Sequence, residues 1–167
     1  MTEEQALAAL NLVFQSPNQN IKIEFQGGEP LLNFPIIKYV VEEGKKLNQQ
    51  FQKNLQFVIA TNLSFVDDEV INFCAIHDVY LSTSIDGPAD IHNKNRPRPG
   101  KNGHQLTTKS LLKIQEALGY DRVSALLTTT AGALDRVEEI IDEYLRLGFM
   151  NIFLRPLSPY GFAIKTK

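Results

Sequence analysis

The sequence predicts an α/β fold in which a parallel sheet is covered by outer helices. Helical stretches alternate with short β-rich runs, and every helix after the first lies between successive strands. The most unusual polar and glycine-rich segments follow strand ends. The order is a helix, then strand and helix four times, then a strand. This spacing suits a (β/α) barrel or a doubly wound sheet, and periodicity does not separate the two.

The first half of the chain carries three predicted helices and three predicted strands. Thr2 can cap a helix over residues 2–14, with Gln5 as its capping-box partner. Asn33 and Pro35 start a second helix, and acidic residues fill the first turn of a third, where the helix dipole favours them. The residues that share one face of each helix are Leu7, Leu10 and Phe14 in the first, Ile36, Val40 and Leu47 in the second, and Val70, Phe73, Cys74 and His77 in the third. The strands are predicted at residues 21–26, 55–60 and 79–84.

The second half begins with a polar loop over residues 86–103 that is rich in Pro, Gly, Asn and Arg. A fourth helix follows and ends at Gly119; a fifth covers residues 134–147 and ends at Gly148. Their aligned apolar positions are Leu111, Ile114, Leu118, Val137, Ile141 and Leu145. The remaining strands are predicted at residues 123–128 and 151–155.

Composition bounds the class of protein. The 167 residues suggest one domain, with 43% hydrophobic and 22% charged residues, an ordinary globular balance. A net charge of −2 gives no broad electrostatic case for nucleic acid, and no apolar run is long enough to span a membrane. The N-terminus does not resemble a signal peptide, so we expect a cytoplasmic protein. The single cysteine, Cys74, excludes an internal disulfide and a cysteine-only metal site within this chain.

The candidate site residues lie where strands end, as they do in parallel α/β folds. Gly27 and Gly28 would let a ligand approach the backbone closely, although a tight turn would also use glycine. Ser84 and Asp86 are able to hydrogen-bond a ligand, although Asp-Gly-Pro is also a strong turn former. The arginines and histidines of the chain allow two further readings. Arg96 and Arg98 are able to bind a carboxylate through their guanidinium groups, although both could also be solvated loop residues. His92 and His104 are expected in a loop, without partners at metal-ligand spacing.

Three motifs in order resemble the radical S-adenosylmethionine (AdoMet) superfamily. The motifs are Phe25-Gln26-Gly27-Gly28-Glu29-Pro30-Leu31-Leu32, then Thr61-Asn62, then Ser82-Thr83-Ser84-Ile85-Asp86-Gly87-Pro88 with Ile91-His92 and Arg96. The branch they resemble includes anaerobic sulfatase-maturating enzymes and other peptide-modifying maturases. Residues 153–162 further resemble the maturase of the His-Xaa-Ser peptide system.

The resemblance implies a partial (β/α)6 barrel over residues 1–167, which uses AdoMet and a [4Fe–4S] cluster to generate a 5′-deoxyadenosyl radical and modify a peptide or protein. It also implies an electron donor such as flavodoxin or ferredoxin. Carried over by position, Gly27 and Gly28 would receive the methionine amino group, while Glu29 would shape the loop. Ser84 would bind the carboxylate or ribose side. The resemblance further implies that Arg96 would pair with the cofactor's carboxylate and that Leu157 would pack near the adenine. Asn62 and Asp86 would line the mouth of the barrel in which the cofactor is held.

The sequence departs from this family in one respect, since it contains no C-x3-C-x2-C motif for the cluster. Its leading helix resembles the helix that follows the cluster loop, so we expect the first strand, the cluster loop and the cysteine-rich C-terminal domain to be missing. We expect a truncated or split gene product or an excised fragment, inactive alone, whose strand at residues 21–26 forms an exposed edge and promotes self-association. Two alternatives stay open: a non-catalytic module that docks a peptide or partner, and an unrelated barrel enzyme, for which no acid/base pair is apparent.

Overall fold

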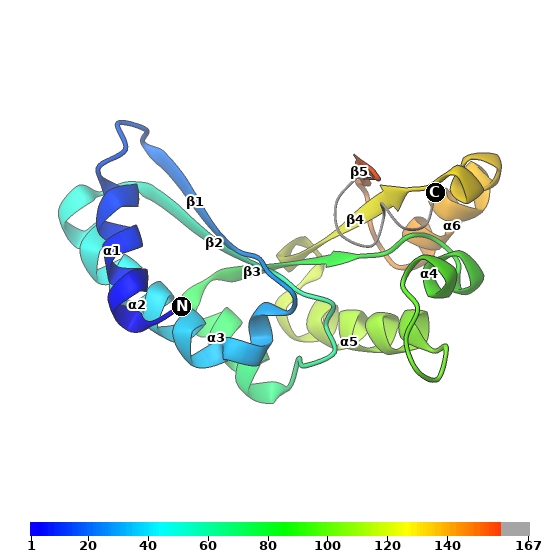
Figure 1. Ribbon diagram of the computed structural model, residues 1–167, viewed down its shortest axis with the longest axis horizontal. Coiled ribbons are helices and arrows are strands. Elements are labelled where there is room, and N and C mark those ends of the chain that lie inside the picture. Colours follow the sequence, from blue (N-terminus) through cyan, green and yellow to red (C-terminus); the bar gives the residue numbers. More distant parts are fainter. Residues whose placement is uncertain (158–167) are drawn as a thin grey trace. The chain divides into compact units, whose positions relative to one another are not determined.

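The structure is a computed structural model, and it describes residues 1–157. The chain divides into two compact units, Met1–Leu81 and Ser82–Lys167, which we call the first and second unit. The strands form one sheet in the order β1-β2-β3-β4-β5, so neighbours in the chain are neighbours in the sheet (Figure 1). The single domain predicted over residues 1–167 stays a prediction.

The first unit contains alternating helices and parallel strands. Its elements are α1 (Glu3–Phe14), β1 (Asn20–Phe25), the 3-10 turn η1 (Pro30–Asn33), α2 (Phe34–Phe51), β2 (Asn54–Ala60), α3 (Asp68–His77) and the beginning of β3 (Val79–Ser84). β1 and β2 pair in parallel from Asn20 opposite Asn54 to Phe25 opposite Ile59. The capping box predicted at Thr2 and Gln5 is confirmed, because each residue's backbone N–H is bonded to the other's side chain.

The second unit continues the same alternation with one helix that the sequence did not predict. Its elements are α4 (Ala89–Asn95), α5 (Gly103–Leu118), the 3-10 turn η2 (Tyr120–Arg122), β4 (Val123–Thr129), the 3-10 turn η3 (Ala131–Arg136), α6 (Val137–Arg146) and β5 (Phe153–Pro156). β4 and β5 pair in parallel, with Leu126 opposite Phe153. The α4 helix lies inside the predicted polar loop, where buried Ile91 and His92 anchor an otherwise polar segment.

The packing face of α6 differs from the predicted one. The aligned residues Val137, Ile141 and Leu145 are 52%, 42% and 58% exposed, whereas Ile140 and Tyr144 are buried. Both apolar rows occur on this helix, so spacing alone did not select between them. The selection comes from tertiary contacts: the Tyr144 hydroxyl donates to the Ile85 carbonyl at 2.7 Å.

β1 lies at the end of the strand order, which leaves one of its edges without a neighbouring strand in the described chain. An edge strand presents unpaired backbone groups to other chains. We therefore expect the 167-residue chain to self-associate. Light scattering over a concentration series checks this: molecular mass should rise with concentration, and a constant monomer mass up to high concentration would contradict it.

Candidate functional site

The loop after β1 contains two glycines that nothing within the described chain requires. Neither Gly27 nor Gly28 has a φ in the left-handed region, and a Cβ built on either would meet no atom within 4 Å. A strained turn would show a positive φ, and close packing would show a clash, so the turn explanation gains no support. What remains is open space beside a bare backbone, which a ligand is able to approach.

Glu29 fixes the C-terminal end of this glycine loop. Its Oε1 accepts hydrogen bonds from the Thr61 hydroxyl at 2.6 Å and the Leu31 N–H at 3.1 Å, and its Oε2 accepts from the Asn62 N–H at 2.9 Å. The carboxylate therefore joins the segment after β1 to the segment after β2. Because Asn62 is held through its backbone, its side-chain Oδ1 caps the following turn by accepting from the Ser64 N–H at 2.8 Å.

The turn after β2 contains an unusual backbone conformation. Leu63 is fully buried and has a φ of 61°, in the left-handed region that a residue with a Cβ rarely adopts. Its N–H donates to the Thr61 hydroxyl oxygen at 3.1 Å. Thr61 thus accepts from Leu63 and donates to Glu29, so a chain of hydrogen bonds runs from the turn to the glycine loop.

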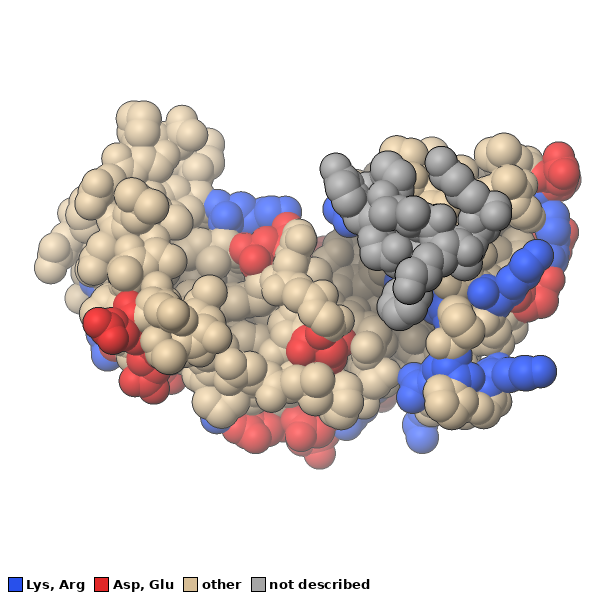
Figure 2. All heavy atoms as spheres, viewed as in Figure 1, with Lys and Arg blue, Asp and Glu red and all other residues tan. Residues whose placement is uncertain are grey.

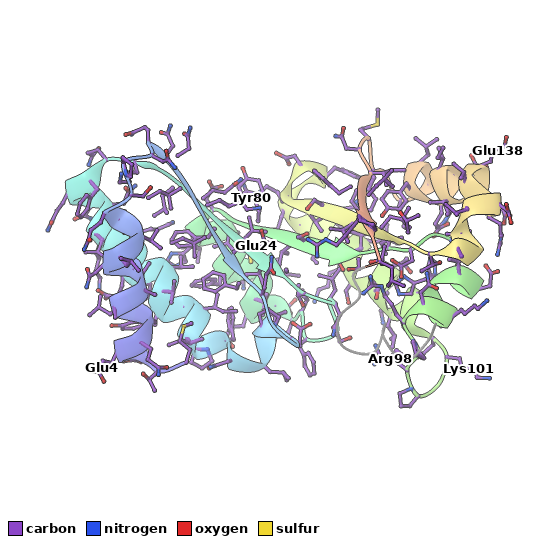
Figure 3. The ribbon with its side chains drawn as sticks, turned by 45° about the horizontal axis from the view of Figure 1, so that its top comes forward. Glu4, Glu24, Tyr80, Arg98, Lys101 and Glu138 are labelled. Carbon is purple, nitrogen blue, oxygen red and sulfur yellow. The ribbon has the colours of Figure 1, made fainter. Side chains whose placement is uncertain are left out.

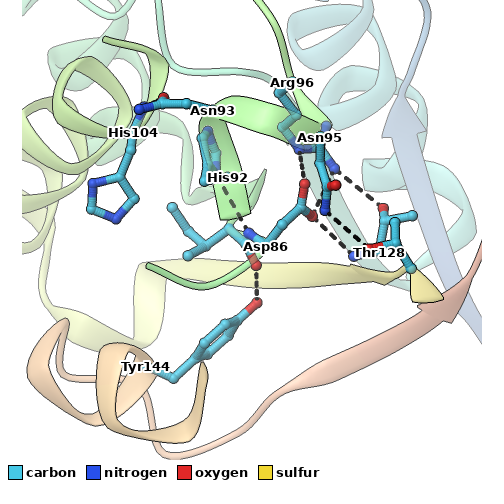
Figure 4. Close-up of polar contacts among 10 residues, drawn as sticks. Asp86, His92, Asn93, Asn95, Arg96, His104, Thr128 and Tyr144 are labelled. Carbon is cyan, nitrogen blue, oxygen red and sulfur yellow. Dashed lines mark hydrogen bonds and ion pairs between the residues drawn. The ribbon is translucent and has the colours of Figure 1, made fainter. Parts of the chain in front are cut away.

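The segment after β3 is built around the buried carboxylate of Asp86, which is 1% exposed (Figure 4). Arg96 Nε and Nη2 donate to its two oxygens at 2.8 and 3.2 Å, and the Thr128 N–H donates to Oδ1 at 3.1 Å. Arg96 Nη2 also donates to the Thr128 hydroxyl at 3.2 Å. The arginine therefore bridges α4, the segment after β3 and β4.

This ion pair bears on the predicted role of Arg96 at the cofactor. The described contacts use its Nε and Nη2, so a ligand carboxylate would have to be met from Nη1. The assignment of Arg96 to the cofactor's carboxylate stays a prediction. Ser84 is half-buried at the last position of β3, and Leu157 is 52% exposed after β5; their predicted roles are likewise untested. Residues 158–162, part of the finer resemblance, lie outside the described residues.

Two histidines of the second unit lie in helices and are buried, not in a loop as predicted. His92 Nδ1 faces the Asp86 N–H at 3.4 Å, and burial lowers the pKa of His92 to about 4. The His104 and His92 rings meet edge to face at 5.6 Å, and His104 Nε2 lies 2.7 Å from Glu143 Oε1. Burial raises the pKa of Tyr144, whose hydroxyl lies beneath the same segment. No signal in the sequence predicted this burial, because both histidines were expected in a polar loop.

Three exposed cations of the second unit lie in or next to the loop that joins α4 to α5. Figure 3 shows Arg98 and Lys101 extending from the loop that joins α4 to α5, and basic side chains gather in the same area of the face shown in Figure 2. Lys94, Arg98 and Lys101 are all exposed. This patch is local, because the chain as a whole carries a net charge of −2.

The structure brings the predicted residues together in two groups. In the first unit, Glu29 joins Asn62 and fixes the end of the glycine loop. In the second unit, Arg96 joins Asp86 a short distance along the chain from Ser84. Both groups follow the carboxyl ends of strands, where parallel α/β folds bind ligands. Sequence reasoning did not anticipate Thr128, because its partner Asp86 lies 42 residues away.

Metal-ligating side chains do not cluster within residues 1–157. No group of three or more His, Cys, Asp or Glu side chains within residues 1–157 is arranged to hold a metal ion. The single Cys74 is fully buried in α3. No helix among these residues is long and apolar enough to cross a membrane.

Known proteins resemble this chain in sequence. No protein-family model matches it. An uncharacterized protein of Methanocaldococcus jannaschii is 29% identical over 95% of this chain and 54% of its own length. A cysteine-type anaerobic sulfatase-maturating enzyme of Clostridium perfringens is 30% identical over all of this chain and 47% of its own length. The radical SAM cyclopropyl synthase TigE of Paramaledivibacter caminithermalis is 24% identical over 77% of this chain and 27% of its own length. The chain spans about half the length of the first two relatives.

Solved structures resemble it in fold. Native anSMEcpe with bound AdoMet matches with a TM-score of 0.83 and 20% identity, over 95% of this chain and 44% of that one. The same enzyme with AdoMet and the Kp18Cys peptide also gives 0.83, with 21% identity, 95% of this chain and 44% of that one. The fold is therefore a partial barrel core of the radical SAM type, which confirms the predicted fold class. Its homologues include anaerobic sulfatase-maturating enzymes and another radical SAM enzyme, as the sequence motifs predicted.

Proposed function

We propose that this chain is the AdoMet-binding part of a radical SAM maturase that modifies a peptide or protein. The observation that carries the proposal is the glycine loop: Gly27 and Gly28 are required by neither backbone conformation nor packing, in a fold that matches an AdoMet-bound enzyme. The relatives with a stated activity, a sulfatase-maturating enzyme and a cyclopropyl synthase, are enzymes, so the comparisons do not favour a non-catalytic binding module.

The chain's own residues would hold AdoMet through its polar ends. The backbone of Gly27 and Gly28 would receive the methionine amino group, and Ser84 with Arg96 would face the carboxylate. Asn62 and Asp86 would line the same mouth, and Leu157 would pack against the adenine. AdoMet supplies hydrogen-abstraction chemistry when bound in a complete enzyme, and the protein's role is to orient it and exclude water.

The [4Fe–4S] cluster does not fit this chain, since a single buried thiol cannot replace three cysteine ligands. The ligands would have to come from protein outside the sequence described. We further propose a cytoplasmic setting, electron delivery by a flavodoxin or ferredoxin, and a peptide substrate, as in the neighbour solved with a peptide. The His-Xaa-Ser maturase is the particular system that residues 153–162 favour.

The test of the proposal is a titration of the isotope-labelled chain with AdoMet, followed by amide NMR shifts. We expect the amides of Gly27, Gly28, Asn62 and Ser84 to move. Adenosine alone is the control, and it should leave Gly27 and Gly28 unshifted because they are assigned to the methionine end. Absence of shifts at these four amides at millimolar AdoMet would overturn the proposal.

The chain alone should assemble no stoichiometric [4Fe–4S] cluster and should not cleave AdoMet. Anaerobic reconstitution followed by iron and sulfide analysis measures the first, and chromatography of the nucleoside products measures the second. A purified chain carrying four irons and four sulfides would contradict this expectation, because Cys74 is its only thiol.

A further inference from the structure

We propose that Glu29 and Thr61 form a hydrogen-bonded staple that positions the glycine loop for AdoMet. The inference rests on the proposed function. The resemblance implied only that Glu29 shapes the loop; the structure shows which donors hold its carboxylate and adds a positioning role for Thr61, and neither side chain needs to touch the cofactor. It is carried by contacts within the first unit alone.

The staple begins at a carboxylate with three protein donors. The Thr61 hydroxyl, the Leu31 N–H and the Asn62 N–H all point at Glu29, from 2.6 to 3.1 Å. Two of these donors lie 32 and 33 residues away, beyond α2 and β2. A carboxylate accepts through both oxygens and donates nothing, so three donors converging on it define its orientation.

The staple stands between a flexible and a rigid segment. On one side are Gly27 and Gly28, which have the widest conformational freedom of any residue type. On the other side is Pro30, whose ring fixes φ at the first position of η1. Glu29 is the point at which the free glycine backbone becomes tied to the body of the unit, so its carboxylate limits how far the loop can move.

Thr61 extends the staple into a strained turn. Its hydroxyl has one proton, which it gives to Glu29, and its oxygen accepts the N–H of Leu63 at 3.1 Å. Leu63 holds a left-handed conformation with a φ of 61° although it is fully buried. Such outliers persist where the surroundings over-determine them, and they gather at ligand sites. Here the surroundings include the Glu29–Thr61 bond.

The test compares Glu29→Gln, Thr61→Val and the double variant with wild type. Amide hydrogen exchange without cofactor is measured first. Exchange at Asn62 and Leu63 should accelerate about tenfold in each single variant, as expected for one lost hydrogen bond. AdoMet titration by NMR should then show affinity weakened about tenfold in each single variant. The double variant should be no worse, because both substitutions break one unit.

Two controls separate positioning from general destabilisation. Glu69→Gln makes the same carboxylate-to-amide change at an exposed residue that pairs with Lys38 on the helical side of the unit, and it should leave exchange and affinity unchanged. Thr61→Ser keeps the hydroxyl and should retain wild-type values, which a steric role of the methyl group would not predict.

The outcomes separate this inference from the proposed function. If wild type shows no AdoMet-induced shift, the proposed function is overturned, and the cofactor-positioning role falls with it. Unchanged exchange at Asn62 and Leu63 in Glu29→Gln overturns the staple itself, whatever AdoMet does. Accelerated exchange with unaltered AdoMet affinity overturns the positioning role while leaving the proposed function in place.

Discussion

Replacement of Arg96 by alanine should lower the free energy of unfolding by about 2–3 kcal/mol. Breaking a fully buried ion pair costs about 3–5 kcal/mol, because the remaining charge is left uncompensated. Asp86 is 1% exposed, but the Arg96 side chain is 38% exposed, so water hydrates part of the resulting gap. Asp86 also keeps the Thr128 N–H as a donor. Urea unfolding of the purified chain at neutral pH measures the loss.

The comparison of the two partners gives this prediction its control. Asp86→Asn leaves the partly hydrated Arg96 unpaired, and it should therefore cost less than Arg96→Ala, which leaves the buried carboxylate unpaired. No loss for Arg96→Ala would show that the pair does not stabilise the fold. A larger loss for Asp86→Asn than for Arg96→Ala would contradict the greater cost that we assign to an unpaired buried carboxylate.

Arg96→Ala also tests the role that the family resemblance implies. If Arg96 clamps the cofactor's carboxylate, cofactor affinity in the cluster-bearing enzyme should fall about ten- to a hundredfold, the range for a charge-assisted hydrogen bond. Arg98→Ala is the matched control from the same exposed segment and should have a small effect. If Arg96 acts only by holding Asp86, Asp86→Asn and Arg96→Ala should weaken affinity together.

Local sequence signals predicted most of the fold. The β3 strand was predicted with its observed bounds, and the other strands differ by at most two residues at either end. Gly119 ends α5, and Gly148 follows α6 with a φ of 80°, as expected for helix stops. These signals are short-range, so the sequence carries them without knowledge of the tertiary structure.

The predictions of secondary structure and of buried faces fail where contacts between residues far apart in the sequence determine the structure. Helix α4 was predicted as loop because its surface is polar, and its burial depends on Ile91 and His92 meeting the rest of the unit. The packing face of α6 depends on Tyr144 reaching the Ile85 carbonyl, 59 residues away. No periodicity in either helix contains that information.

For the candidate site, too, the sequence predicted which residues matter but not their long-range contacts. The motifs identified Gly27, Glu29 and Asp86 as residues of interest, but not what their side chains touch. Glu29 finds donors after β2, and Asp86 finds Arg96 and Thr128. The sequence allowed Arg96 to be either paired or exposed to solvent. Nothing in it showed that Asp86, ten residues earlier, would accept hydrogen bonds from the guanidinium.

Acidification from pH 7 to pH 5 should lower the free energy of unfolding by about 2 kcal/mol through His92 alone. Burial lowers the pKa of His92 from its usual 6.5 to about 4 in the folded protein. Neighbouring Arg96 and His104 lower the pKa of His92 further, while Asp86 and Glu143 oppose the shift. Because the unfolded chain binds the proton more readily, the stabilisation is complete above pH 6.5 and is lost as the pH falls toward 4.

The measurement is urea unfolding at pH 7, 6 and 5, for wild type and for His92→Asn. The asparagine Oδ1 is able to accept the Asp86 N–H in place of His92 Nδ1, and it does not titrate, so the variant should lose most of the pH dependence in this range. His77→Gln is the control: burial also lowers the pKa of His77 at the end of α3, but this residue is only half-buried, so the variant should retain most of the pH dependence. Carboxylates such as Glu143, whose pKa is lowered by Arg146 and His104 against the effect of burial, contribute below this range. An equally steep pH dependence in His92→Asn and wild type would show that the buried imidazole is not its source.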